Sequence, residues 1–120
     1  MKLLFLHQNF PGQFRHIVDA LAQDPANEVV AIGQRKPADL GLTAPRLQYI
    51  RYQPKREPNA STHRYLVGLE GAVLAGQAVV EVLARLKQRG FMPQVIVAHP
   101  GWGESLYVRE IFPTAKVVNF

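Results

Sequence analysis

The stretch FLHQNFPGQFRH, residues 5–16, decides the fold. In it an apolar run ends at Leu6, polar residues follow, and Pro11-Gly12 turns the chain into a helical pattern. The apolar runs at residues 2–7 and 28–33 are short and nearly continuous. Such runs are typical of strands that are buried on both faces of a parallel sheet.

Between these two runs lies an amphipathic helical pattern. Its apolar residues recur at i, i+3, i+4 and i+7, the spacing of one helix face, and they are Phe14, Ile17, Val18 and Leu21. We expect this helix to end near Asp24-Pro25, because proline disfavours helical geometry in the residue before it. Residues 2–33 therefore predict a strand, a helix and a second strand, which is a βαβ unit.

The chain after this unit continues the alternation. Residues 47–52 predict a strand, at the sheet edge because Arg51 lies within it, and residues 36–45 and 53–62 predict loops. Residues 94–98 predict a buried strand, 105–112 a short helix and 116–120 a last strand.

A long helical pattern runs from about 63 to 89 and ends at Gly90. Its apolar residues form two stripes, Leu66, Leu69, Val73, Val80 and Leu83 in one and Val79, Val82 and Leu86 in the other. Three glycines within it, Gly68, Gly71 and Gly76, indicate either close backbone packing or a break, and the sequence leaves both open.

These elements predict a single Rossmann-like domain over residues 1–120. The expected architecture is α/β in three layers, α/β/α, around a doubly wound parallel sheet of about five strands in the order 3-2-1-4-5. The first and fourth strands are then neighbours at the topological switch point, where open α/β sheets bind ligands. The loops 7–13 and 99–104 are expected to face each other there, with His7 and His99 close together.

Composition narrows the classes of function. The formal charge is +5, and half of the 14 Lys and Arg residues lie between positions 35 and 64. That segment is either a solvated face or a contact for phosphates, anionic lipid or nucleic acid. The chain has no cysteine, which excludes disulfides, thiolate metal sites and a cysteine nucleophile. No signal-peptide core and no run of about 20 apolar residues is evident, so we expect a cytoplasmic domain.

Several familiar sites are missing from the sequence. It has no P-loop motif and no G-x-S-x-G motif, and the turn after the first strand has one glycine, Gly12, where a dinucleotide site needs three. Arg35 and Lys36 keep NADP binding open as a minor alternative. A metal site at His7 and His99 would have only Glu104 as a further ligand, and we predict none.

Polar recognition fits the two loops better. Gln8, Asn9 and Gln13 offer neutral donors and acceptors, which suit a hydroxyl-rich ligand, and Trp102 offers a flat face for a sugar ring or a base. Gly101 and Gly103 would leave room for a ligand, and a helix beginning after Gly103 would favour an anion. The alternative is structural: Trp102 covers the sheet edge and the amides cap helices.

Three segments resemble the amino-terminal domain of bacterial glycosyltransferases of family 4: HQNFPGQFRH, HRYLVGLEGAVLAGQAVVEVLARLKQRGFMPQVIVAHPGWGESL and FPTAKVVNF. The resemblance implies half of a GT-B enzyme that is retaining and transfers a sugar from a nucleotide-sugar to a glycan or glycolipid acceptor. It implies no cofactor beyond the nucleotide-sugar substrate, no nucleic-acid partner and a missing carboxyl-terminal domain that binds the donor. The basic segment 35–64 would then meet an anionic acceptor or the inner face of the membrane.

The resemblance also implies roles for individual residues. His99 is the catalytic candidate, because a histidine at this strand end lies close to the transferred sugar in the family. In the family the first loop approaches the acceptor and the donor phosphates, and the matching residues here are Asn9, Pro11, Gly12 and Gln13, with Gly101, Trp102, Gly103 and Glu104 beside His99. The position of the loop at the switch point adds His7 and Gln8 to the predicted acceptor site. A freestanding, non-catalytic binding module with the same sheet is the alternative function.

Overall fold

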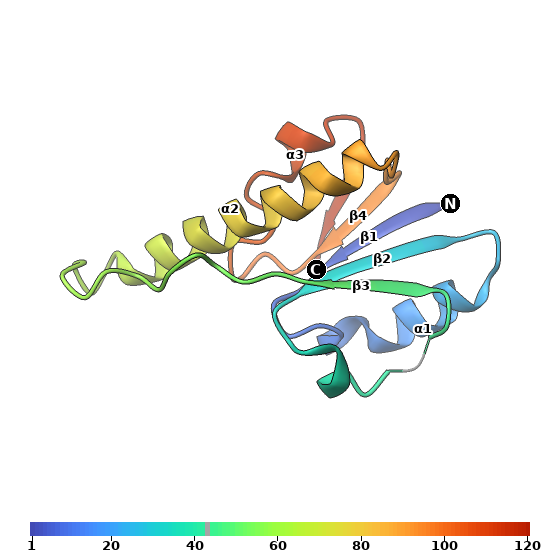
Figure 1. Ribbon diagram of the computed structural model, residues 1–120, viewed down its shortest axis with the longest axis horizontal. Helices are drawn as coiled ribbons and strands as arrows, with labels where there is room; N and C mark the ends of the chain where they lie inside the picture. Colours follow the sequence, from blue (N-terminus) through green and yellow to red (C-terminus); the bar gives the residue numbers. More distant parts are fainter. Residues whose placement is uncertain (43) are drawn as a thin grey trace.

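Five parallel strands form one sheet in the computed structural model, which describes residues 1–42 and 44–120 (Figure 1). The strand order is β3-β2-β1-β4-β5. The strands are β1 (Lys2–Leu6), β2 (Glu28–Gly33), β3 (Leu47–Arg51), β4 (Val95–Ala98) and β5 (Lys116–Asn119). The predicted α/β fold, strand order and edge position of the third strand are confirmed.

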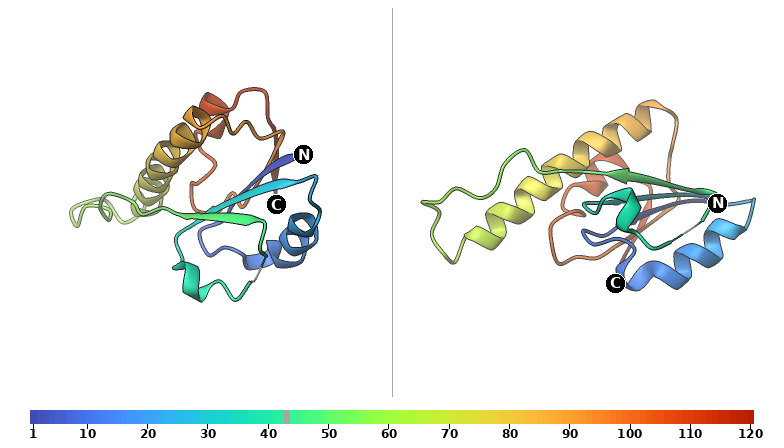
Figure 2. Two further views of the ribbon diagram at one scale, coloured as in Figure 1. Left: turned by 45° about the vertical axis from the view of Figure 1, so that its right-hand side comes forward. Right: turned by 60° about the horizontal axis from the view of Figure 1, so that its bottom comes forward.

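Helices cover both faces of the sheet, which gives the predicted three layers. Helix α1 (Arg15–Gln23) packs on one face, and α2 (Val67–Gln88) and α3 (Val108–Ile111) pack on the other (Figure 2). Two separate hydrophobic clusters fill the two interfaces. Strands β1 and β4 pair with Leu3 opposite Val95 and Leu6 opposite Ala98, so the loops that follow them start side by side.

The buried face of α1 differs from the predicted one. Phe14, Val18 and Ala22 are almost completely buried, whereas Ile17 is 47% exposed. The chain enters this helix through a 3-10 turn at Gly12–Phe14, and the residues that then face the sheet follow a spacing of four. The helix therefore buries a narrower stripe than the sequence pattern predicts.

Helix α2 has two unlike halves. It begins at Val67 rather than near 63, and its eight buried residues all lie between Leu74 and Leu86. Leu66 and Leu69 are 52% and 62% exposed, so the amino-terminal part of the predicted first stripe is wrong. This end of the helix and the segment 53–62 run together beyond the sheet, where no strand lies beneath them (Figure 1).

By length and composition alone α2 could cross a membrane: it has 22 residues, and an 18-residue window within it has a mean hydropathy of 1.6. The helix did not stand out in the sequence, because Glu70, Gln77 and Glu81 interrupt its apolar residues. The core helix of a soluble protein passes the same test, and the buried part of α2 packs on the sheet. The apolar composition thus follows at least in part from burial in this core.

The glycines of α2 do not break it, because the helix is continuous from Val67 to Gln88. A Cβ atom on Gly76 would lie 2.9 Å from the carbonyl oxygen of Gly103 and 2.9 Å from the Tyr107 ring. Close packing therefore explains Gly76. A Cβ atom on Gly68 would have nothing within 4 Å, so neither close packing nor a break in the helix explains this glycine.

Candidate functional site

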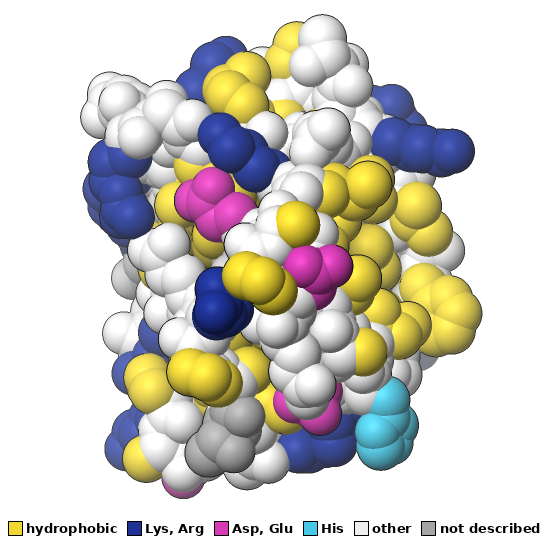
Figure 3. Space-filling view, turned by 90° about the vertical axis from the view of Figure 1, so that its right-hand side faces the viewer, with side chains coloured by type: hydrophobic (Ala, Val, Ile, Leu, Met, Phe, Trp, Pro, Cys, Tyr) yellow, Lys and Arg dark blue, Asp and Glu magenta, His cyan; other side chains and the backbone are white. Residues whose placement is uncertain are grey.

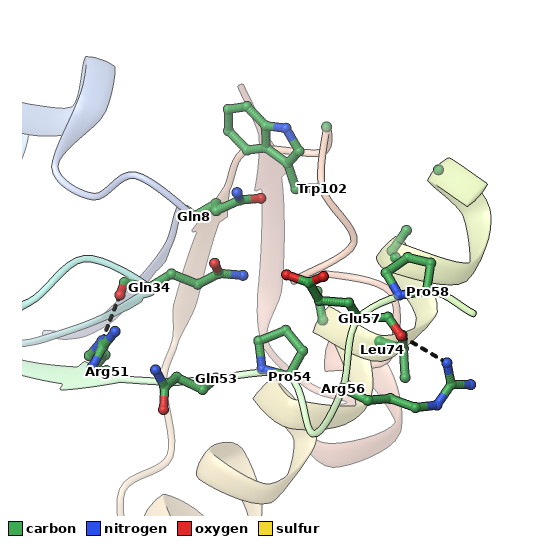
Figure 4. Close-up of a pocket in the computed structure, with 15 residues that line it drawn as sticks. Gln8, Gln34, Arg51, Gln53, Pro54, Arg56, Glu57, Pro58, Leu74 and Trp102 are labelled. Atoms are coloured by element: carbon green, nitrogen blue, oxygen red, sulfur yellow. Dashed lines mark hydrogen bonds between the residues drawn. The ribbon is translucent and has the colours of Figure 1, made fainter. Parts of the chain in front are cut away.

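A groove of about 620 Å³ lies at the carboxyl ends of β1, β2 and β3 (Figure 4). The loop after β4 and the amino-terminal half of α2 complete its walls. The polar and aromatic residues that line it are Gln8, Gln34, Arg51, Gln53, Arg56, Glu57 and Trp102. Its remaining lining is small or apolar: Pro54, Pro58, Gly68, Gly71, Ala72, Leu74, Ala75 and Gly101.

The two histidines at the ends of β1 and β4 are neighbours, as predicted. The ring centroids of His7 and His99 are 5.0 Å apart. Trp102 lies against both, stacked on His99 at 4.5 Å and 23° and tilted against His7 at 5.4 Å. Loops 7–13 and 99–104 therefore meet in one aromatic cluster at the switch point.

His7 uses both of its ring nitrogens inside the protein. Its Nδ1 accepts a hydrogen bond from the Asn9 N–H at 3.0 Å, and its Nε2 is 3.2 Å from Gln13 Oε1. Since the Gln13 oxygen only accepts, the network assigns the ring proton to Nε2. The ring is 3% exposed, and burial lowers the pKa of His7. His7 is therefore a neutral, internally bonded group.

His99 leaves one nitrogen available. Its Nδ1 accepts from the Gly101 N–H at 3.1 Å, which assigns the proton of a neutral ring to Nε2. That N–H has no protein partner in the part of the chain that the structure describes. The ring is only partly buried, and Trp102 beside it is 37% exposed. A neutral His99 can thus donate a hydrogen bond through Nε2 beside an accessible aromatic face.

Two glycines of these loops hold the histidines rather than a ligand. A Cβ atom on Gly12 would lie 2.5 Å from His7 Nε2, and one on Gly101 would lie 2.6 Å from His99 Cε1. Gly103 is buried, and a Cβ there would collide with the Ala72 carbonyl of α2. The expected room for a ligand beside Gly103 is therefore taken up by α2. Gly101 remains exposed and lines the groove, although His99 occupies the place of a Cβ atom there.

The expected helix directly after Gly103 is absent. Helix α3 begins only at Val108 and has four residues, because residues 104–107 form turns. The predicted anion site at a helix amino terminus is therefore wrong. Glu104 is 1% exposed and accepts a hydrogen bond from the Tyr52 hydroxyl at 2.9 Å. Burial raises the pKa of Glu104, and its Oε2 has no partner.

The other predicted residues of the first loop divide between the groove and its surroundings. Gln8 lines the groove. Asn9 is exposed and Pro11 is buried, and neither lines it. The Gln13 side chain lies on the α1 side of the loop, where its Nε2 donates to the Phe120 carbonyl at 2.9 Å.

The sequence reasoning missed the groove residues that follow β2 and β3. Gln34 comes directly after β2, whereas Gln53 and Gln8 come two residues after the ends of β3 and β1, so one glutamine follows each of three adjacent strands. The signal was the strand order itself, since the carboxyl ends of parallel strands share one sheet edge. Figure 4 shows Gln8 and Gln34 on one side of the groove and Arg56 and Pro58 on the other.

Arginine is the main source of positive charge in the groove. Arg56 is paired with Glu70 at 2.8 Å, whereas Arg51 donates its Nε to the Gln34 carbonyl at 2.7 Å. At the amino ends of the strands, Figure 3 shows Lys and Arg side chains dispersed among acidic, neutral and apolar groups. Arg51 thus brings a guanidinium to the floor of the groove, and within the described residues this guanidinium forms no salt bridge with a carboxylate.

Metal ligands do not cluster in the described structure. Within residues 1–42 and 44–120 no group of three or more His, Asp or Glu residues could hold a metal ion. The groove offers neutral hydrogen bonding from three glutamine amides, the aromatic face of Trp102, two guanidiniums and one carboxylate. His99 does not line the groove itself but stacks on Trp102, which does. Such a lining suits a hydroxyl-rich ligand.

A profile of the Glycosyl transferase family 4 group matches residues 25–120, and no curated protein matches the chain. The matched residues include β2 to β5, α2 and most of the groove, while β1 and the loop 7–13 precede them. Because the match covers most of the chain, the protein belongs to the glycosyl transferase family 4 group.

Proposed function

We propose that this domain is the acceptor side of a retaining glycosyltransferase that uses a nucleotide-sugar donor. The observation that carries the proposal is the groove at the switch point, where Trp102 offers a flat face beside His99 and three glutamines. Sugars bind through such a combination, because their C–H faces stack on aromatic rings and their hydroxyls pair with neutral amides. The acceptor would be a glycan or a glycolipid.

His99 would orient a hydroxyl of the sugar in this account. Its Nδ1 is occupied by the Gly101 N–H, so a neutral ring presents a donor at Nε2. A donor fixes the oxygen of a hydroxyl and leaves the hydroxyl proton free for another acceptor. His99 would therefore act by positioning and polarising rather than by removing a proton through Nε2.

The donor would bind to a second domain, and the acceptor groove would face it. The roles of Asn9, Pro11, Gly12 and Gln13 near the acceptor, which the family resemblance implies, stay part of this proposal. So does contact of the segment 35–64 with anionic lipid, although Lys55 and Arg56 of that segment pair with Glu81 and Glu70. This domain alone would not transfer sugar.

The test is a binding comparison by nuclear magnetic resonance. The 120-residue chain is titrated with methyl glycosides of glucose, galactose, mannose and N-acetylglucosamine, and separately with UDP and GDP, the nucleotide parts of common sugar donors. The proposal predicts that at least one glycoside shifts the indole N–H of Trp102 and the side-chain amide of Gln8. It predicts that the nucleotide parts of the sugar donors leave these signals unchanged.

Matched aromatic variants control this titration. Trp102→Ala should abolish the shifts, whereas Tyr65→Ala, which removes an aromatic ring that is 75% exposed near the start of α2, should leave them intact. A groove that binds the nucleotides and none of the glycosides would assign it to the donor instead. Absence of any binding at Trp102 would contradict the proposal altogether.

A further inference from the structure

We infer that Gln34, held by a chain of hydrogen bonds to Tyr52 and Glu104, presents its amide oxygen to the groove and selects a ligand hydroxyl that can donate a hydrogen bond. The inference rests on the proposed function, since it names the chemistry that the same groove reads. Gln34 is assigned as the specificity residue, and Tyr52 and Glu104 as the residues that position it.

The backbone of Gln34 is held on both sides. Its N–H donates to the Gln8 carbonyl at 2.9 Å, and its own carbonyl accepts from Arg51 Nε at 2.7 Å. These bonds join the loop after β1, the end of β2 and the last residue of β3. The residue therefore cannot shift without disturbing two neighbouring strands.

The side chain of Gln34 is held by a directed chain of hydrogen bonds. Its Nε2 donates to the Tyr52 hydroxyl at 3.1 Å, and this hydroxyl donates to Glu104 Oε1 at 2.9 Å. A hydroxyl has one proton, so a Tyr52 that donates to Glu104 has only its lone pairs left for Gln34. The Gln34 group that faces Tyr52 must then be its NH₂.

Burial keeps this chain in one direction. Tyr52 is 2% exposed and Glu104 is 1% exposed, so no bulk water competes for their bonds. Burial, and the carboxylate beside it, raise the pKa of Tyr52, and the hydroxyl retains the proton that it donates. The orientation of the Gln34 amide is thus set from inside the protein.

The consequence appears at the groove surface. With one N–H committed to Tyr52, Gln34 offers its Oε1 and a single remaining N–H to a ligand. Figure 4 shows this side chain extending into the groove beneath Gln8 and Trp102. Gln8 and Gln53 also line the groove, but their side chains make no hydrogen bond within residues 1–42 and 44–120, so their amides are free to turn.

A fixed acceptor discriminates between similar ligands. A sugar hydroxyl can donate to Gln34 Oε1, whereas its methyl ether cannot and would leave this oxygen unpaired. Freely turning amides adapt to either ligand. The groove should therefore prefer one free hydroxyl over its methyl ether by about threefold to tenfold, the usual range for one net hydrogen bond.

The first arm of the test needs no ligand. In ¹⁵N-labelled protein, the side-chain amide of Gln34 should show one hydrogen-bonded proton with slowed exchange, and Tyr52→Phe should remove that protection. The side-chain amide of Gln53 serves as the internal reference. Equal exchange for Gln34 and Gln53 would overturn the inference, whatever the groove binds.

The second arm measures selectivity. The best-binding methyl glycoside of the four named above is compared with its mono-O-methyl ethers in the wild type, Gln34→Leu and Gln53→Leu. One ether should bind about threefold to tenfold more weakly to the wild type and to Gln53→Leu, and Gln34→Leu should lose that preference. A preference that survives Gln34→Leu would overturn the inference while leaving sugar binding, and so the proposed function, intact.

Two further variants separate positioning from folding. Tyr52→Phe leaves the buried Glu104 without its partner, so Tyr52→Phe with Glu104→Met removes both polar groups and should fold but lose the preference. Glu104→Gln keeps an acceptor for the Tyr52 hydroxyl, so this variant should retain the preference for the free hydroxyl. If Glu104→Gln and the double variant behave alike, the chain of hydrogen bonds is not what positions Gln34. If no glycoside binds, the proposed function fails, and the exchange measurement alone decides whether the chain of hydrogen bonds holds Gln34.

Discussion

His7 and His99 occupy equivalent places at the ends of two adjacent parallel strands, and both accept a hydrogen bond at Nδ1 from the N–H two residues later. They differ at Nε2. In His7 this atom is bonded to Gln13 and the ring is buried, whereas in His99 it is free of protein partners in the described structure. The same residue type in the same local turn is therefore structural on one strand and available for binding on the next.

The glycines beside them repeat the contrast. Gly12 lies against the His7 ring and Gly101 lies against the His99 ring. Gly12 also has a φ of +49°, which disfavours any other residue, while Gly101 has no such angle. One loop is built around a buried imidazole, and the other only supports a partly exposed one.

Truncation of the two histidines should separate their roles most strongly. His7→Ala removes a buried ring with two hydrogen bonds and should lower the free energy of unfolding by about 3 kcal/mol. His99→Ala should lower the free energy of unfolding by less than about 1 kcal/mol, because the native ring is partly exposed and makes only one hydrogen bond within the described residues. Urea unfolding measures both. Equal losses for the two variants would refute the division of roles.

Alanine at the two glycines should sharpen the same contrast with a smaller effect. Gly12→Ala combines a left-handed backbone with a collision against a ring that cannot move, and should cost about 2 kcal/mol. Gly101→Ala should cost about 1 kcal/mol, because His99 can rotate toward solvent.

Trp102 fluorescence gives an independent readout of this pair, since Trp102 stacks on His99. Under native conditions, the Trp102 emission of Gly101→Ala should differ from that of the wild type more than the emission of Gly12→Ala does. The reverse order would mean that the Trp102 stack depends on the first loop instead.

The pH dependence of stability is the smallest expected effect. Burial lowers the pKa of His7 below its ordinary value of 6.5, so between these two pKa values the unfolded chain binds more protons than the folded one. Stability should therefore fall as the pH drops below 6.5. His7→Gln should flatten this part of the profile, measured by thermal unfolding against pH, and an unchanged slope in that variant would assign the effect to another group.

The strands and their order could be predicted from the sequence because burial on both faces leaves continuous apolar runs such as Val29 to Ile32. The meeting of His7 and His99 followed from that order. The exposure of the amino-terminal half of α2 could not be predicted from the sequence. Periodicity shows which side chains are apolar but not whether another element covers them, as the exposed Leu66 and Leu69 illustrate.

The groove was only partly predictable for a related reason. Loops 7–13 and 99–104 carry several distinctive residues, whereas Gln34 and Gln53 belong to no motif. Their role depends on neighbours distant in sequence: Gln34 is bonded to Tyr52, and Tyr52 to Glu104. Pairings of this kind require the three-dimensional structure.

The most direct test of the central claim follows the Cε1–H signals of both histidines while a binding methyl glycoside is added to the intact chain. The account predicts that the His99 signal shifts in step with the Trp102 indole signal, because Trp102 lines the groove and the partly exposed His99 ring stacks on it. It predicts that the His7 signal stays in place because its ring is enclosed. A shift of the His7 signal with an unmoved His99 signal would contradict it.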